Sequence, residues 1–128
     1  LDKYVLCRDK IANLYNKNFE NNAKVAQLIQ KKNRKSSHHL YVLKIQDKSL
    51  DRNLLYKLLR DNGIGVNVHY IPVYRQPYFK NKVVENYLRE SEIYYSSAIS
   101  LPIFPTMTKE DVDYVVRTTI QNIEKIKV

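Results

Sequence analysis

The first twenty residues place apolar side chains at a helical period. They recur three and four positions apart, at Leu1, Tyr4, Val5, Ile11, Ala12, Tyr15 and Phe19, which is typical of an amphipathic helix with one buried face. No Ser, Thr, Asp or Asn precedes this helix as an N-cap, and its apolar pattern already begins at the first residue. We therefore expect residues 1–22 to be a long interdomain helix that continues upstream in a longer chain. Residues 23–128 would form a small domain.

Three segments have the pattern of strands. HHLYVLKI (38–45) is rich in aromatic and β-branched residues and is apolar on both faces, which predicts a central strand. VNVHY (66–70) is predicted as a second strand, and AISLPI (98–103) as a third that Pro102 stops. AKVAQLIQKKNRK (23–35) fits either a short helix or an irregular connection to the sheet, and its pattern does not decide between them.

Further helices are predicted between these strands. A leucine face at Leu50, Leu54, Leu55, Leu58 and Leu59 follows a cap at Ser49 or Asp51, and Gly63 ends the helix in a left-handed conformation. Residues 81–97 are partly helical in pattern, with Ser91 as a candidate cap. Thr108 and Asp111 form a capping-box signature before a last helix that is apolar to Ile126. This order predicts an α/β fold of the α+β type, a two-layer sandwich with three or four strands.

The loop IPVYRQPYF (71–79) contains Pro72 and Pro77, which exclude a regular helix or central strand. It follows His69 at the end of a predicted strand, where binding groups are often presented. Three tyrosines lie four residues apart here: Tyr70, Tyr74 and Tyr78. Two interpretations stay open: they pack the loop against the sheet with hydroxyls at its rim, or they form a wall that faces a ligand.

The chain of 128 residues fits one domain, and 22 Lys+Arg against 13 Asp+Glu gives 22 − 13 = +9. Residues 1–35 hold nine basic and three acidic groups, so two-thirds of the excess lies there, including Lys31, Lys32, Arg34 and Lys35. A nucleic-acid surface would interleave aromatic residues with these cations, yet residues 24–37 contain none. We expect a solvated surface and no nucleic-acid partner. No apolar run approaches the ~18 residues of a membrane span, so we expect no membrane partner and a cytoplasmic protein.

Motifs of self-contained catalytic sites are absent. The sequence lacks CxxC, HExxH, P-loop, GxGxxG and GxSxG patterns, so we expect no metal site and no nucleotide hydrolysis. His38 and His39 would point to opposite faces of a strand, and we expect one hydrogen-bonded ring and one solvated ring. The single cysteine, Cys7, lies among apolar residues and is expected to be buried as a small hydrophobe.

Three runs together carry a resemblance to a known family. They are SSHHLYVLKI (36–45), LLYKLLRDNGIGVNVHYIPVYRQPYF (54–79) and SEIYYSSAISLPIFPTMTKEDVDYVV (91–116). Their order and spacing resemble the C-terminal part of the DegT-type sugar-nucleotide aminotransferases. The resemblance implies the small C-terminal domain of the aspartate aminotransferase-like fold, about the last third of a family member. Within the family, the first two runs are most similar to the pseudaminic acid branch.

This resemblance implies pyridoxal 5'-phosphate as cofactor, bound mainly by the missing large domain. It also implies a 4-keto nucleotide sugar as substrate, glutamate as amino donor and a homodimer for the full-length enzyme. No catalytic or cofactor-binding residue is expected in this chain, which would be inactive alone. Asn67, Val68, His69 and Tyr70 would form a substrate-binding wall. The alternatives are a basic, non-enzymatic module that binds nucleic acid or another polyanion, and a family member that has lost catalysis.

Overall fold

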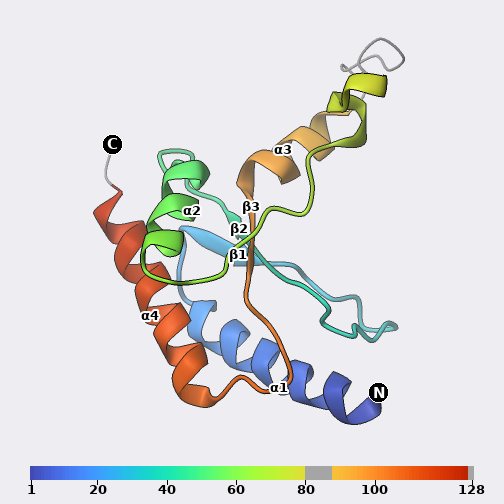
Figure 1. Ribbon diagram of the computed structural model, residues 1–128, viewed down its shortest axis with the longest axis vertical. Helices are drawn as coiled ribbons and strands as arrows, with labels where there is room; N and C mark the ends of the chain where they lie inside the picture. Colours follow the sequence, from blue (N-terminus) through green and yellow to red (C-terminus); the bar gives the residue numbers. More distant parts are fainter. Residues whose placement is uncertain (80–87, 127–128) are drawn as a thin grey trace.

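The structure, a computed structural model, describes residues 1–79 and 88–126. These residues form helices and strands in the following order: α1 (Asp2–Phe19), β1 (Val25–Gln27), β2 (Tyr41–Ile45), α2 (Arg52–Asp61), α3 (Arg89–Ser97), β3 (Ala98–Leu101) and α4 (Lys109–Lys125). Two 3-10 turns, η1 (Val73–Arg75) and η2 (Pro77–Phe79), lie between α2 and α3. Figure 1 shows this arrangement along the chain.

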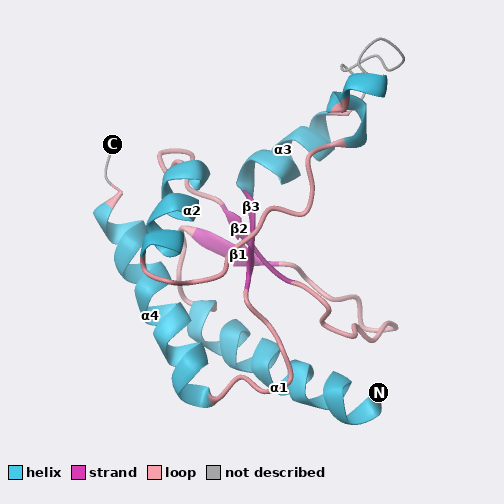
Figure 2. Ribbon diagram, viewed as in Figure 1, coloured by secondary structure: helices cyan, strands magenta, loops and turns pink. Residues whose placement is uncertain are grey.

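The sheet has three antiparallel strands in the order β1-β2-β3. β2 is central, as its apolar pattern on both faces predicts, and Leu43 pairs with Ile99 of β3. Helices α1 and α2 each pack against α4, α1 also contacts β1, and α2 also contacts β3 (Figures 1 and 2). The α/β fold with a small three-stranded sheet and a helical layer is therefore confirmed.

The two faces of the sheet have different neighbours. Side chains alternate along a strand. On the face toward the helices, Tyr41, Leu43 and Ile45 of β2 and Ile99 and Leu101 of β3 join the core. The opposite face of β3 carries the two small residues Ala98 and Ser100, both buried although they lie outside that core. A polar side chain is thus held inside the protein on the face away from the helices.

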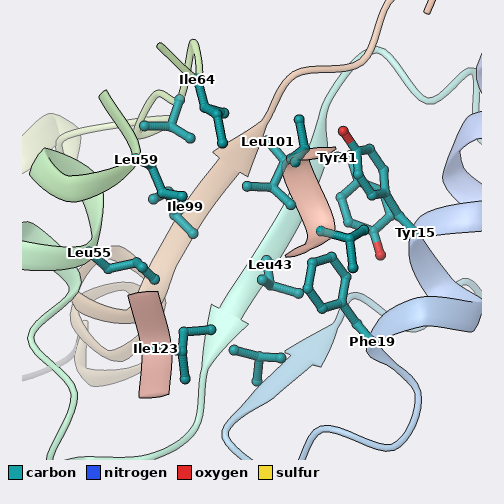
Figure 3. Packing of buried hydrophobic residues seen from close by; sticks show 14 of the residues in the cluster. Tyr15, Phe19, Tyr41, Leu43, Leu55, Leu59, Ile64, Ile99, Leu101 and Ile123 are labelled. Carbon is teal, nitrogen blue, oxygen red and sulfur yellow. The ribbon is translucent and has the colours of Figure 1, made fainter. Parts of the chain in front are cut away.

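The core unites α1 with the rest of the domain. Tyr15 and Phe19 of α1 are completely or almost completely buried against β2, as Figure 3 shows. Leu55 and Leu59 of α2 and Ile123 of α4 fill the part of the same core next to Ile99 of β3. The predicted amphipathic faces are confirmed in the second half of α1 and at Leu55 and Leu59 of α2, where the periodic apolar residues are buried. Leu1, Tyr4 and Leu54 of the predicted stripes are exposed.

The predicted helix ends are also confirmed. Asp51 caps α2 by accepting hydrogen bonds from the backbone N–H groups of Asn53 and Leu54. Gly63 has a φ of 75°, the left-handed conformation that favours glycine after a helix. Thr108 and Asp111 form the reciprocal capping box at the start of α4. These local signals fix where the helices begin and end.

Several sequence predictions were wrong in detail. Residues 25–27 form the edge strand β1, which is neither a helix nor an irregular connection. The predicted strand 66–70 is reduced to one bridge between Asn67 and Ser100. The backbone N–H of Val68 donates to the Asn67 side chain. Ser91 lies inside the first turn of α3, whose N-cap is Leu88. The part of the predicted helix at 81–87 lies outside the described residues.

A projecting arm leaves the sheet after the Asn67 bridge. We use this name for residues 70–79 and 88–97, which extend away from the sheet and the other helices in Figure 1. Tyr70 and Tyr78 are 72% and 71% exposed. The interpretation that these tyrosines pack the loop against the sheet is therefore wrong, because the arm turns away from it.

Candidate functional site

The four predicted substrate residues lie where the chain passes from the sheet into the arm. Asn67 is hydrogen-bonded to Ser100 of β3 through both backbone groups, at 2.8 and 3.1 Å. Val68 and His69 are partly buried, whereas Tyr70 is largely exposed. The structure thus places Asn67–Tyr70 on one continuous stretch, anchored to the sheet at its start and open to solvent at its end.

His69 is held by contacts on two sides. Its Nδ1 lies 2.9 Å from the Ser100 Oγ. The Tyr70 ring meets it edge-on, with centroids 4.7 Å apart and an interplanar angle of 81°. An imidazole held in this way presents its remaining nitrogen, Nε2, as a hydrogen-bonding group.

An aromatic cleft of about 560 Å³ continues from Tyr70 along the arm. The 70–74 segment forms one wall and α3 forms the other, with four tyrosines among the lining residues: Tyr70, Tyr74, Tyr94 and Tyr95. Burial raises the pKa of the Tyr94 hydroxyl, which therefore stays protonated and neutral. Flat, apolar walls with a few hydroxyls suit a planar ligand that carries polar edges.

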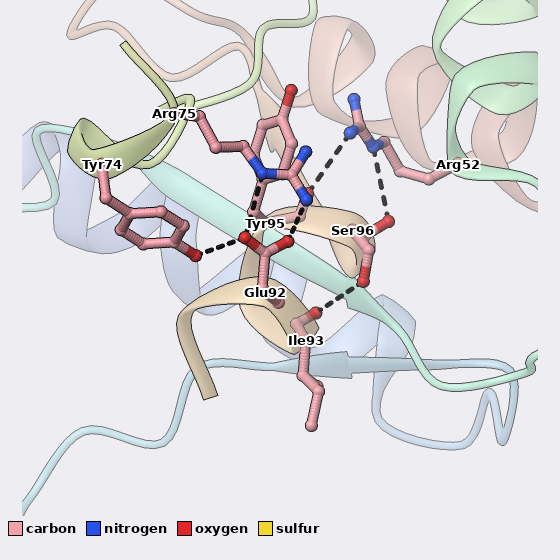
Figure 4. A network of polar contacts seen from close by, with 7 residues as sticks. All are labelled: Arg52, Tyr74, Arg75, Glu92, Ile93, Tyr95 and Ser96. Carbon is pink, nitrogen blue, oxygen red and sulfur yellow. Dashed lines mark hydrogen bonds and ion pairs between the residues drawn. The ribbon is translucent and has the colours of Figure 1, made fainter. Parts of the chain in front are cut away.

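The two walls of the cleft are joined by Glu92, as Figure 4 shows. Its carboxylate, on α3, accepts a hydrogen bond from the Tyr74 hydroxyl and forms a two-pronged ion pair with Arg75 of η1. Hydrogen bonding from Tyr74, followed by that from Arg75, lowers the pKa of Glu92 below its usual range. We call this set of three residues the Glu92 clamp.

Tyr95 connects the Glu92 clamp to the body of the domain. The Arg75 guanidinium carbon lies 5.3 Å from the centroid of its ring, and that of Arg52 lies 5.4 Å from it, both within cation–π range. Arg52, the first residue of α2, also donates to the carbonyl oxygens of Tyr95 and Ser96 at the end of α3 (Figure 4). A cation at a helix C-terminus is favourable, so this contact fixes the direction of α3.

We expect Glu92→Gln to loosen the cleft while leaving the core folded. The amide retains one acceptor oxygen but loses the charge that pairs with Arg75, so backbone amides of 73–75 should exchange hydrogen several-fold faster. The measurement is hydrogen–deuterium exchange, with Glu124→Gln as the matched control, because Glu124 is an exposed carboxylate on α4 that does not line the cleft.

Acid should reproduce this effect in the unsubstituted chain. Because the folded pKa of Glu92 is lowered, its contribution is present above the ordinary carboxyl pKa and is lost as the pH falls through the lowered value. Equal exchange in the Glu92 and Glu124 variants at neutral pH would contradict the assigned role of the clamp.

Other candidate residues from the sequence lie elsewhere. His38 lies 3.3 Å from Asp9 of α1, whereas His39 is exposed, so one ring has a partner and one is solvated as expected, although both precede β2. Cys7 is a free thiol and only partly buried. Residues 31–37, with the basic cluster, are exposed throughout. Among the described residues, no three His, Cys, Asp or Glu side chains gather as metal ligands.

The sequence analysis missed Glu92 and Ser100. Glu92 stands 18 positions after Tyr74, and Ser100 stands 31 positions after His69. Both residues belong to the third run that carries the family resemblance, but nothing in their own pattern indicates these partners. The only available signal was a polar residue, Ser100, within an otherwise apolar strand.

The described residues do not form a pyridoxal phosphate site by themselves. That cofactor requires a lysine amine for its aldehyde and an acidic group for its ring nitrogen. Every described lysine is exposed or half-exposed, and none lines the aromatic cleft. In the part of the chain that the structure covers, no helix is long and apolar enough to cross a membrane.

Comparison with known proteins identifies the family. The profile of the DegT/DnrJ/EryC1/StrS aminotransferase family matches residues 1–120. A UDP-4-amino-4,6-dideoxy-N-acetyl-beta-L-altrosamine transaminase of Campylobacter jejuni is 34% identical over 128 residues, 99% of this chain and 34% of the relative. The spore coat polysaccharide biosynthesis protein SpsC of Bacillus subtilis is 36% identical over 83 residues, 61% of this chain and 21% of the relative. The chain thus spans about a third of the length of the transaminase relative.

Solved structures share the fold. PseC of Helicobacter pylori, an aminotransferase involved in the biosynthesis of pseudoaminic acid, superposes with a TM-score of 0.86 and 26% identity over 95% of this chain and 33% of that one. The PLP form of the putative sugar aminotransferase Spr1654 from Streptococcus pneumoniae gives a TM-score of 0.89 and 28% identity over 98% of this chain and 32% of that one. The predicted resemblance is confirmed, and this chain belongs to the DegT/DnrJ/EryC1/StrS aminotransferase family.

Proposed function

We propose that this chain is the C-terminal small domain of a pyridoxal-phosphate-dependent aminotransferase. The enzyme would transfer the amino group of glutamate to a 4-keto nucleotide sugar, in the branch of nucleotide-sugar biosynthesis that leads to pseudaminic acid. The observation that carries this proposal is the 34% identity with the Campylobacter transaminase across 99% of the chain. The fold shared with sugar aminotransferases supports it.

The stretch Asn67–Tyr70 and the aromatic cleft would form one wall of the substrate site. His69 Nε2 and the Tyr70 hydroxyl can hydrogen-bond sugar or phosphate oxygens. Beyond them, the tyrosines of the cleft offer flat faces on which a nucleobase can stack. The Glu92 clamp would keep both walls in place before substrate arrives, which lowers the entropic cost of binding.

The rest of the full-length enzyme would supply the cofactor site and its lysine. Residues 1–22 would link the two domains: the second half of α1 lies in the core of this one, whereas Leu1, Tyr4 and Leu6 are 93%, 57% and 53% exposed. We also propose that the full-length enzyme is a cytoplasmic homodimer. This chain alone should bind no pyridoxal phosphate and catalyse no transamination.

A chimera tests this proposal. The segment of the Campylobacter transaminase that aligns with this chain, 34% of its length, is replaced by residues 1–128. We expect the chimera to show the visible absorbance of bound pyridoxal phosphate and to aminate the 4-keto nucleotide sugar with glutamate. The transaminase lacking that segment is the negative control. A chimera that binds the cofactor and reacts with glutamate, but accepts no nucleotide sugar, would overturn the proposed function.

A further inference from the structure

Ser100 is an unusual residue for its place in the fold. It lies in β3, where all four residues are buried, and it is only 4% exposed. Its side chain is on the face of the sheet away from the helices, because Ile99 and Leu101 on either side point into the core. Burying a hydroxyl without a hydrogen-bond partner is costly, so its partner has structural consequences.

That partner is His69. The Ser100 Oγ lies 2.9 Å from His69 Nδ1, and the backbone of the same serine holds Asn67 through two hydrogen bonds. One buried residue therefore fixes the 67–69 stretch at two points, through its main chain and through its side chain. Among the described residues, the imidazole is the polar group that meets this hydroxyl.

This contact bears on which nitrogen of His69 carries the proton, because the Ser100 hydroxyl can donate to a bare Nδ1 or accept from an Nδ1–H group. The hydroxyl hydrogen of Ser100 needs an acceptor, and His69 Nδ1 provides one when it is unprotonated. The neutral ring then carries its proton on Nε2, so a donor N–H points away from Ser100. A donor suits the oxygen atoms of a sugar or a phosphate, which accept hydrogen bonds.

We propose that Ser100 is a positioning residue that holds His69 in the Nε2–H tautomer and thereby prepares it as a hydrogen-bond donor to the nucleotide sugar. The tautomer of His69 depends only on contacts within this chain and requires no substrate. Its use toward a nucleotide sugar rests on the proposed function. The two parts therefore have separate tests.

The first test is nitrogen-15 NMR of the His69 ring in residues 1–128, at a pH where the imidazole is neutral. We expect the unsubstituted chain to show the Nε2–H form as the main species. Ser100→Ala should shift His69 toward the tautomer mixture of a free imidazole, and Ser100→Thr, which keeps a hydroxyl, should restore the original signal. Ser97→Ala is the matched control, because that hydroxyl donates to the Ile93 carbonyl within α3.

An Nδ1–H ring in the unsubstituted chain would overturn the proposal whether or not any variant folds. Unchanged His69 signals in folded Ser100→Ala would also overturn it. The second test introduces Ser100→Ala into the active chimera, where KM for the nucleotide sugar should rise about five-fold with the glutamate half-reaction unchanged. A shifted tautomer with an unchanged KM would uphold the positioning by Ser100 and contradict the assignment of His69 to the substrate site.

Discussion

Raising the pH above 10 is expected to lower the free energy of unfolding of this domain steeply, because two buried tyrosines ionise when the chain unfolds. Tyr15 is completely buried and Tyr41 is 5% exposed, with ring centroids 4.6 Å apart. Their hydroxyls donate to the Pro102 carbonyl at 2.8 Å and to the Asn16 side chain at 2.9 Å. Burial raises the pKa of both hydroxyls well above the ordinary value, and for Tyr15 the neighbouring Tyr41 raises it further.

The direction of this effect follows from proton binding. Between the ordinary tyrosine pKa and the raised one, the unfolded chain releases protons that the folded chain retains. Stability is therefore intact below pH 10 and falls as the pH rises toward the folded pKa values. Each tyrosine contributes a loss of about 1.4 kcal/mol per pH unit, or about 2.8 kcal/mol for the pair.

The free energy of unfolding, measured by denaturant titration between pH 8 and roughly pH 11, checks this prediction. Tyr15→Phe removes one of the two titrating groups and should halve the slope above pH 10. Tyr4→Phe changes an exposed ring of the same helix and should leave the slope unchanged. A slope in Tyr15→Phe as steep as in the unsubstituted domain would show that these hydroxyls do not control alkaline unfolding.

Replacing His69 by alanine in the active chimera is expected to raise KM for the nucleotide sugar about ten-fold, the loss of one good hydrogen bond. The rate of the half-reaction with glutamate should change by less than about two-fold, because the proposed substrate wall contacts the sugar nucleotide and not the amino donor. Separate single-turnover measurements of the two half-reactions make this comparison.

His39→Ala is the matched control for this substitution. It also removes an imidazole, but an exposed one that lies three positions before Val42 of β2. It should alter neither half-reaction. Equal losses in both half-reactions of His69→Ala would contradict the placement of His69 in the sugar-nucleotide wall, and would point instead to a general disturbance of the active site.

Local signals made most of the secondary structure predictable. The capping box of Thr108 and Asp111 and the left-handed Gly63 act over a few residues, so their effect can be read from neighbouring positions. The failures occur where a partner distant in sequence decides. Residues 25–27 become a strand because Ile45 and its neighbours offer an edge, and the predicted strand 66–70 pairs only at Asn67, whose partner is Ser100 of β3.

The candidate site divides in the same way. The strand end with His69, followed by a loop with two prolines, marked this stretch as a place where side chains are presented. This local pattern did not indicate that Glu92 would bind Tyr74 and Arg75, or that Ser100 would contact the imidazole. Those contacts depend on the direction in which the arm leaves the sheet, which Arg52 and Tyr95 help to set.

The sequence by itself determined the class of fold, the central strand, the helices and the family resemblance, because periodicity, caps and ordered motifs are properties of the chain alone. Only the tertiary structure decided that Tyr70 and Tyr74 leave the sheet to line a cleft, and that a buried serine contacts Nδ1 of His69. The physical reason is that hydrogen bonds and cleft walls join residues far apart in sequence, whose meeting is fixed by packing.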